Sequence, residues 1–147
     1  MHWLIGHEPV EVFASAAGEA RSDVRTEDLT AVFRFADGST GTVLYTALGS
    51  KAFLKERIEV FTDGSTAALD DFRRLTIRGA KRVDCCCRRQ DKGHGAELEH
   101  FADVILGRTQ PQLTATDGIR ATICCLAILQ SARNGQAVNI DLGLASK

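Results

Sequence analysis

The sequence lacks long hydrophobic runs, and it has no excess of charge of one sign. No stretch approaches the ~20 apolar residues that span a bilayer, and the start has no signal-peptide pattern. Its 18 basic and 19 acidic residues give a formal net charge of -1, so there is no electrostatic reason to bind nucleic acid. These absences predict a cytoplasmic protein with neither a membrane nor a nucleic-acid partner.

Metal-binding and nucleophile motifs are also missing. The five cysteines form no CxxC pair, and neighbours on a strand point to opposite faces, which argues against a metal site. No Gly-x-Ser-x-Gly elbow and no Cys–His pair stands out, so no catalytic residue is assigned. We therefore expect the cysteines (Cys85, Cys86, Cys87, Cys124 and Cys125) to be small buried apolar side chains.

The length of 147 residues and the 44% hydrophobic fraction are typical of one globular domain, here residues 1–147. The first residues, Met1 to Gly6, look like the last turn of a helix closed by a glycine cap. The beginning of that helix is absent, which suggests that the sequence starts inside an element.

Alternating apolar residues and Asp-Gly-Ser turns predict a series of hairpin-connected strands. The expected strands cover residues 10–16, 29–35, 40–48, 57–62, 66–70, 74–78 and 81–89, with a short final strand at 138–142. A three-and-four spacing over Leu98 to Ile105 predicts a helix that ends near Gly107. A second helix is expected from Gly118 to Arg133, capped by Thr116 and Asp117, closed by Asn134-Gly135, and apolar enough to be well buried.

Together these elements predict an α+β fold. We expect a mostly antiparallel open sheet of about six strands with two helices packed on one face. The other face should serve oligomerisation, because both sides of the strands carry apolar residues, as Val32 and Leu44 illustrate.

The segment Lys92-Gly93-His94 joins a strand to a helix, where backbone N–H groups attract oxygen-rich ligands. Two of the three glycines of a dinucleotide fingerprint are present, but Leu98 stands where the third is needed. The segment is therefore either a ligand-binding loop, with Lys92 and His94 as substrate-binding residues, or an ordinary solvated helix start. Lys51 either binds an anion or belongs to a solvated rim of charged residues. We interpret Glu97 and His100 as part of a solvated helix face.

Several segments resemble the C-terminal domain of the glucose–fructose oxidoreductase/inositol dehydrogenase (Gfo/Idh/MocA) family. They are Trp3-Leu4-Ile5-Gly6-x-x-Pro9, residues 55–61 and 68–72, Lys92-Gly93-His94-x-x-Glu97-Leu98, Asp117-Gly118 and Ser131-x-x-x-Gly135-x-x-Val138. The Lys-Gly-His-x-x-Glu form of the fourth segment is similar to one branch of the family, in which this domain is fused behind an alcohol-dehydrogenase-like half.

The resemblance implies hydride transfer between NAD or NADP and a sugar, cyclitol or sugar derivative in the full-length protein. The family's Rossmann domain and catalytic histidine would precede Met1, so this chain alone should bind no cofactor and should be inactive. It should supply part of the substrate pocket and pair as a homodimer or higher homo-oligomer through its sheet. The alternative is a stand-alone, non-catalytic module for small-ligand binding or dimerisation.

Overall fold

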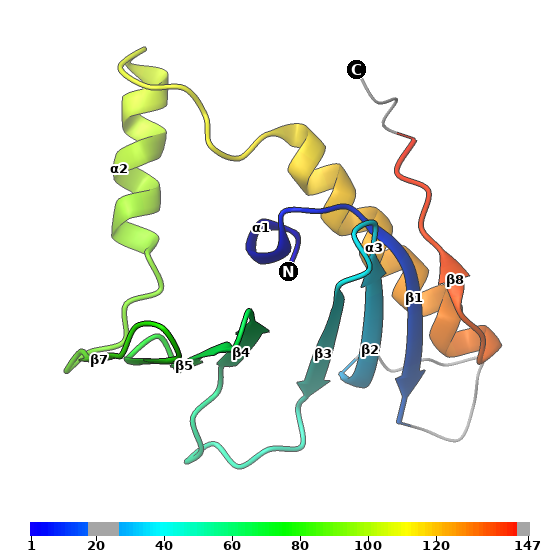
Figure 1. Cartoon of the computed structure of the whole chain (residues 1–147). Helices are drawn as coiled ribbons and strands as arrows, with labels where there is room; N and C mark the ends of the chain where they lie inside the picture. Colours follow the sequence, from blue (N-terminus) through cyan, green and yellow to red (C-terminus); the bar gives the residue numbers. More distant parts are fainter. Residues whose placement is uncertain (18–26, 144–147) are drawn as a thin grey trace. The chain divides into compact units, whose positions relative to one another are not determined.

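The computed structural model describes residues 1–17 and 27–143, which form an α+β arrangement of short elements (Figure 1). In chain order the elements are α1 (His2–Ile5), β1 (Pro9–Ala16), β2 (Asp28–Phe35), β3 (Thr40–Thr46), β4 (Arg57–Thr62), β5 (Ser65–Asp70), β6 (Arg74–Arg78), β7 (Val83–Cys86), α2 (His94–Ile105), α3 (Ala115–Asn134) and β8 (Val138–Asn139).

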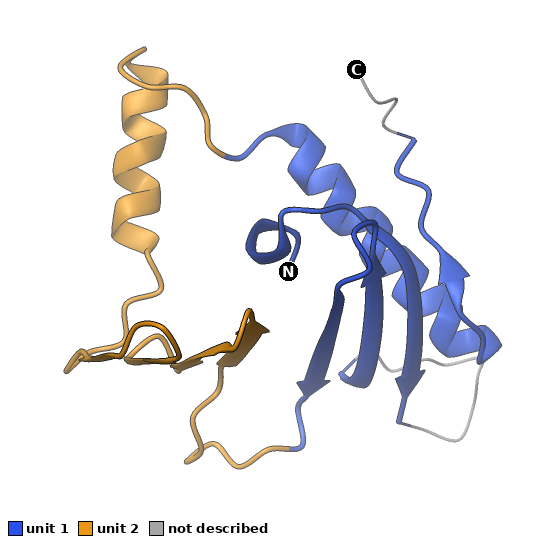
Figure 2. Ribbon diagram, viewed as in Figure 1, with its two compact units in different colours: residues 1–48, 113–147 blue, residues 49–112 orange. Residues whose placement is uncertain are grey.

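These elements belong to two compact units (Figure 2). Unit 1 comprises residues 1–48 and 113–147, and unit 2 comprises residues 49–112. The strands of the described residues pair in two four-stranded antiparallel sheets, ordered β3-β2-β1-β8 and β4-β5-β6-β7. The antiparallel α+β prediction is confirmed, but the expected single sheet of about six strands is wrong. The single domain over residues 1–147 stays a prediction.

Unit 1 contains the hydrophobic core. Helix α3 packs against β1 and β8 and lies along one face of the sheet (Figure 1). Alternate residues of β1 and β2 point to that face, because successive side chains of a strand alternate. The buried core residues are Val12, Ala14, Ala31, Phe33, Phe35, Ala127 and Ile140. The alternation read from the sequence in the first two strands is thus confirmed.

The termini of α3 differ in part from the prediction. The helix begins after Thr114, whose side chain and Asp117 form a reciprocal capping box, so the cap expected at Thr116 is wrong. Its end at Gly135 has the expected left-handed glycine. Only Ala127 and Ser131 are buried, and Leu126 is 60% exposed, so the helix is less covered than its apolar sequence indicates.

Unit 2 has no buried residue among those described. A two-residue turn, Asp63-Gly64, joins β4 to β5. Both of its residues have positive φ, and β5 begins directly after it at Ser65. At Gly79 only glycine fits, because a Cβ there would lie 2.7 Å from the Ser65 Cα. The predicted bounds of β4 and β6 are confirmed.

Helix α2 exists as predicted, but its apolar face is open. None of its residues is buried, and Leu98, Phe101 and Ile105 are each more than 60% exposed. The prediction of two helices packed on one sheet face therefore holds for α3 alone. None of the helices in the described residues has the length and apolarity needed to cross a membrane.

The predicted burial of the cysteines is wrong for four of the five. Cys85, Cys86, Cys87 and Cys125 are exposed, and Cys124 is half-buried. The first three lie on or just after β7, which is the last strand of its sheet and pairs only with β6. Cys125 lies on a side of α3 that the sheet does not cover, and burial raises the pKa of the neighbouring Cys124 thiol.

Candidate functional site

Unit 2 gathers polar side chains around Lys92, and we name Glu56, Asp71, Gln90 and Lys92 the Lys92 cluster. The Lys92 ammonium forms an ion pair with the Glu56 carboxylate. The Gln90 amide donates to Asp71 Oδ1 at 2.9 Å and lies 3.5 Å from Glu56 Oε2. The cluster therefore joins residues that lie more than 30 positions apart in the sequence.

The backbone holds this cluster in place. Asp71 and Phe72 both have left-handed backbone angles, with φ values of 52° and 51°, which non-glycine residues rarely adopt. The Asp71 N–H donates to the Glu56 carbonyl at 2.7 Å, and Asp71 Oδ1 accepts from the Lys55 N–H at 3.3 Å. These contacts fix the turn after β5 against the segment that leads into β4.

The loop from Gln90 to His94 reaches α2 through a tight turn. Asp91 Oδ1 accepts from the Gly93 N–H at 2.8 Å, and Gly93, with φ of 81°, is the N-terminal cap residue of α2. His94 is the first residue of the helix, and it is exposed. The structure thus places Lys92 and His94 on either side of one turn, but it ties the Lys92 ammonium to Glu56.

The other predicted or considered residues are not part of this cluster. Lys51 is exposed in the segment between β3 and β4, and no contact joins it to Lys92 or His94 in the described part of the chain. His100, considered with Glu97, has a structural contact instead: its Nε2 accepts from the Gln112 N–H at 3.3 Å.

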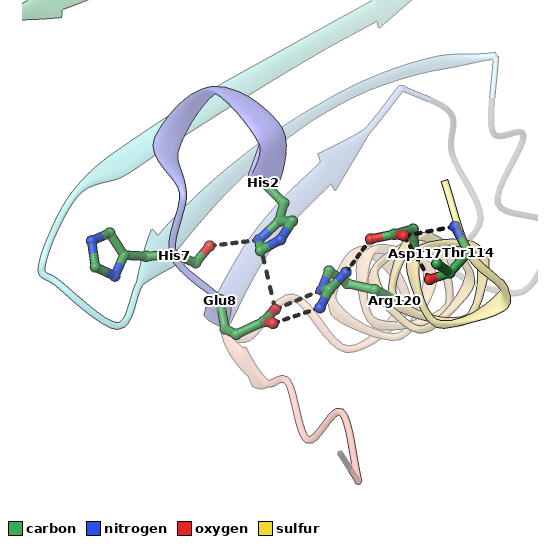
Figure 3. A network of polar contacts seen from close by, with 6 residues as sticks. All are labelled: His2, His7, Glu8, Thr114, Asp117 and Arg120. Atoms are coloured by element: carbon green, nitrogen blue, oxygen red, sulfur yellow. Dashed lines mark hydrogen bonds and ion pairs between the residues drawn. The ribbon is translucent and has the colours of Figure 1, made fainter. Parts of the chain in front are cut away.

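A second polar network lies in unit 1 and was not predicted from the sequence (Figure 3). Arg120 donates to both carboxylate oxygens of Glu8, at 2.7 and 2.6 Å, and to Asp117 Oδ1 at 2.7 Å. His2 Nδ1 lies 2.9 Å from the His7 carbonyl oxygen and 3.7 Å from Glu8 Oε2. The network joins the α1–β1 loop to the first turns of α3.

The charges of this network stabilise one another. The hydrogen bonds from Arg120 hold the pKa of Glu8 below its ordinary value, and the contact with Glu8 raises the pKa of Arg120. The N–H and hydroxyl of Thr114 lower the pKa of Asp117. Arg120 is only 12% exposed and has carboxylate partners on both sides, so its guanidinium is committed to the fold. We therefore regard the network as structural.

The Lys92 cluster offers the better chemistry for a ligand. An ammonium and an amide donate hydrogen bonds, and two carboxylates accept them, which suits a ligand with several hydroxyl groups. Their side chains are only partly covered: Lys92 is 31% and Glu56 is 36% exposed. Of the cluster, only Lys92 was predicted as a site residue. Glu56 and Asp71 lie in segments that carry the family resemblance, but they and Gln90 were missed as site residues, because the pairing of distant segments brings them there.

No family model and no curated protein matches the chain. Solved structures do match. The chain is 23% identical to an aldose-aldose oxidoreductase from Caulobacter crescentus complexed with glycerol, with a TM-score of 0.75, covering 94% of this chain and 43% of that one. It is 19% identical to the UDP-N-acetylglucosamine 3-dehydrogenase GnnA from Acidithiobacillus ferrooxidans, with a TM-score of 0.75, covering 90% and 43% of the two chains.

A third match is the WlbA dehydrogenase from Bordetella pertussis in complex with NADH and UDP-GlcNAcA. It is 20% identical, with a TM-score of 0.60, and the alignment covers 95% of this chain and 41% of that one. The chain therefore spans less than half the length of these structures. The resemblance predicted from the sequence is confirmed in three dimensions: the chain has the fold of one part of Gfo/Idh/MocA-type oxidoreductases.

Proposed function

We propose that this chain is the substrate-side, C-terminal domain of an NAD(P)-dependent oxidoreductase that acts on a sugar, a cyclitol or a sugar derivative. The observation that carries the proposal is the match along 94% of the chain to 43% of a sugar oxidoreductase, at a TM-score of 0.75. A second match holds NADH and UDP-GlcNAcA, which supports a nicotinamide cofactor and a sugar-derivative substrate. In this proposal the cofactor, NAD or NADP, binds a dinucleotide domain outside this chain.

Within this function, the Lys92 cluster and His94 form the part of the substrate pocket that this chain supplies. Glu56 holds the Lys92 ammonium while part of the Lys92 side chain stays exposed. Such an ion pair orients the donor before a ligand arrives, which lowers the entropy lost on binding. His94, exposed at the start of α2, adds a ring nitrogen that can donate to or accept from a sugar hydroxyl.

The test is steady-state kinetics of the longer oxidoreductase that contains this chain. His94→Ala should lower kcat/KM for the sugar substrate about tenfold, equivalent to ~1.4 kcal/mol. Glu99→Gln is the matched control, because Glu99 is exposed on the same helix and outside the cluster, and it should leave kcat/KM within about twofold of wild type. Unchanged kinetics for His94→Ala would remove the loop from the site.

We further propose that the domain assembles as a homodimer or higher homo-oligomer through the open face of the unit 1 sheet. Phe13 and Val32 pair across β1 and β2, and Thr30 pairs with Leu44 across β2 and β3. Phe13, Val32 and Leu44 are 46%, 43% and 74% exposed on the face away from α3. Large apolar side chains exposed on one face of a sheet are typical of an interface.

A further inference from the structure

The β6–β7 hairpin of unit 2 combines exposed thiols with a concentration of positive charge. We name residues 73–89 the arginine hairpin. It contains one acidic residue, Asp84, and seven exposed basic residues: Arg73, Arg74, Arg78, Lys81, Arg82, Arg88 and Arg89. This is a strong local imbalance in a chain whose formal net charge is -1. Cys85, Cys86 and Cys87 lie inside it, and all three are exposed.

The strand register places Cys86 directly beside an arginine. Cys86 pairs with Arg74 across β7 and β6, so their side chains share one face of the sheet with Cβ atoms about 5 Å apart. Cys85 pairs with Leu75 and belongs to the opposite, apolar face. Of the two cysteines within β7, Cys86 is therefore the one on the charged face, while Cys87 follows the strand and its N–H donates to the Arg73 carbonyl at 2.7 Å.

Little of the positive charge is neutralised within the hairpin. Asp84 pairs with Arg78 at 2.8 Å and with Arg82 at 3.7 Å. The hydrogen bond from Arg78, followed by the charges of Arg78, Arg82 and Arg74, holds the pKa of Asp84 below its ordinary value. Arg74, Arg88 and Arg89 form no ion pair with a carboxylate of residues 1–17 or 27–143. An open hollow is lined by residues 87–91, which include Arg88, Arg89 and one carboxylate, Asp91.

The same geometry disfavours a disulfide within the hairpin. Successive side chains of a strand point to opposite faces, and residues two apart on one face are about 6.6 Å apart. A disulfide needs Cβ atoms about 3.5–4.5 Å apart. A disulfide at Cys86 therefore requires a sulfur from outside the hairpin.

We propose that Cys86 is a modification site for small anionic disulfides, such as glutathione disulfide, which the arginine hairpin attracts. The Cys86 thiol loses its proton to water, and the thiolate attacks one sulfur of the disulfide. A new S–S bond forms between Cys86 and that sulfur, while the original S–S bond breaks. Its electron pair leaves with the second thiolate, which takes a proton from water. A free thiol reverses the reaction by the same exchange.

Cys125 provides an internal comparison. It is exposed like Cys86, but it lies on α3 in the stretch from Ala121 to Leu129, which contains no charged residue. Each site is described by one ratio: its rate with anionic glutathione disulfide divided by its rate with cationic cystamine. The thiolate fraction of a site cancels in this ratio, and the same ratio at high salt controls for a difference in access. The electrostatic field of the arginines should raise this ratio for Cys86 above the ratio for Cys125.

The experiment uses the reduced 147-residue chain with Cys85→Ser and Cys87→Ser, so that Cys86 is the sole thiol of the hairpin. Site-resolved rates come from peptide mass spectrometry after the remaining thiols are trapped. At about 20 mM salt the ratio for Cys86 should exceed that for Cys125 about tenfold. At about 0.5 M salt, where screening acts within a few ångströms, the two ratios should agree within about twofold.

Two variants show whether the hairpin is the cause. Arg74→Gln should lower the Cys86 ratio at least about twofold at low salt, because it removes the charge directly opposite. Arg133→Gln removes an exposed arginine outside the hairpin and should leave the ratio unchanged. Equal ratios for Cys86 and Cys125 at low salt, or a difference that persists at high salt, would overturn the proposal.

Discussion

Ser131 provides the sharpest test of the packing in unit 1. It is completely buried, and its hydroxyl bridges three segments. Its Oγ accepts from the Ala14 N–H at 2.8 Å and donates to the Gln136 carbonyl at 2.6 Å. Strand β8 pairs with β1 at Glu11 and Val12 and does not extend to Ala14. The Ser131 hydroxyl therefore supplies the hydrogen-bond acceptor for the Ala14 N–H that a longer β8 would supply. The Ser131-x-x-x-Gly135 spacing noted in the sequence thus has a physical basis.

Ser131→Ala should remove both hydrogen bonds. It leaves the Ala14 N–H without this partner in a buried place, whereas Gln136 is exposed and its carbonyl can bind water instead. One buried group left unsatisfied costs about 1–3 kcal/mol, and the free energy of unfolding should fall by that amount. For an m-value of about 2 kcal/mol/M, the urea midpoint should fall by about 0.5–1.5 M.

The assay is urea unfolding followed by far-UV circular dichroism, with hydrogen exchange of α3 and β1 to report on unit 1 alone. Ser15→Ala is the matched control, because Ser15 is exposed on β1 and should change the stability by less than about 0.5 kcal/mol. A Ser131→Ala chain as stable as the control would refute the bridging role of the hydroxyl.

Three further predictions follow from the fold and the proposed function. The pKa of Glu8 is lowered from 4.5, so the contribution of Glu8 to stability is complete above that pH and is lost as the pH falls through the folded-state pKa. Glu8→Gln should therefore make the free energy of unfolding fall less steeply toward acid pH, which urea titrations at several pH values measure. The isolated chain should bind neither NAD(H) nor NADP(H) by isothermal titration calorimetry, and micromolar binding would contradict the placement of the cofactor outside this chain. Sedimentation equilibrium at micromolar concentration should show a dimer or larger assembly that Leu44→Asp weakens, whereas a 15.9 kDa monomer for the unsubstituted chain would show that the open sheet face is no interface.

Local signals in the sequence predicted most of the secondary structure. Apolar alternation gave the bounds of β4 and β6, and turn glycines such as Gly38 and Gly64 separated the strands where the structure has positive φ. The glycine caps at Gly6 and Gly135 were also predicted correctly. These features depend on neighbouring residues, so a local pattern is sufficient to find them.

The errors concern contacts between distant residues. The eight strands that the structure describes divide into two sheets, and no local periodicity encodes which strands pair. Cysteine is a residue type that is often buried, and Cys86 was expected in the core, but it lies in an edge strand and is exposed. Periodicity reports which face of an element is apolar, and it does not report whether another layer covers that face.

The candidate site divides in the same way. The turn and helix start at Lys92 to His94 gave a recognisable local pattern, whereas Glu56 lies 36 residues from Lys92 and came from the fold. The Arg120–Glu8 pair, 112 residues apart, was missed for the same reason. The capping-box spacing of Thr114 and Asp117 was readable, but the neighbouring Thr116 offered a competing cap.

The most direct test of the proposed function is the intact mass of the protein purified from its source cells, measured by mass spectrometry with peptide mapping. The solved oxidoreductases are more than twice as long as the part that this chain matches. We predict a polypeptide of more than twice 15.9 kDa, with a peptide that continues from upstream residues through Met1 into His2 and Trp3. A cellular protein of 15.9 kDa that begins at Met1 would contradict the account and favour a stand-alone binding or dimerisation module.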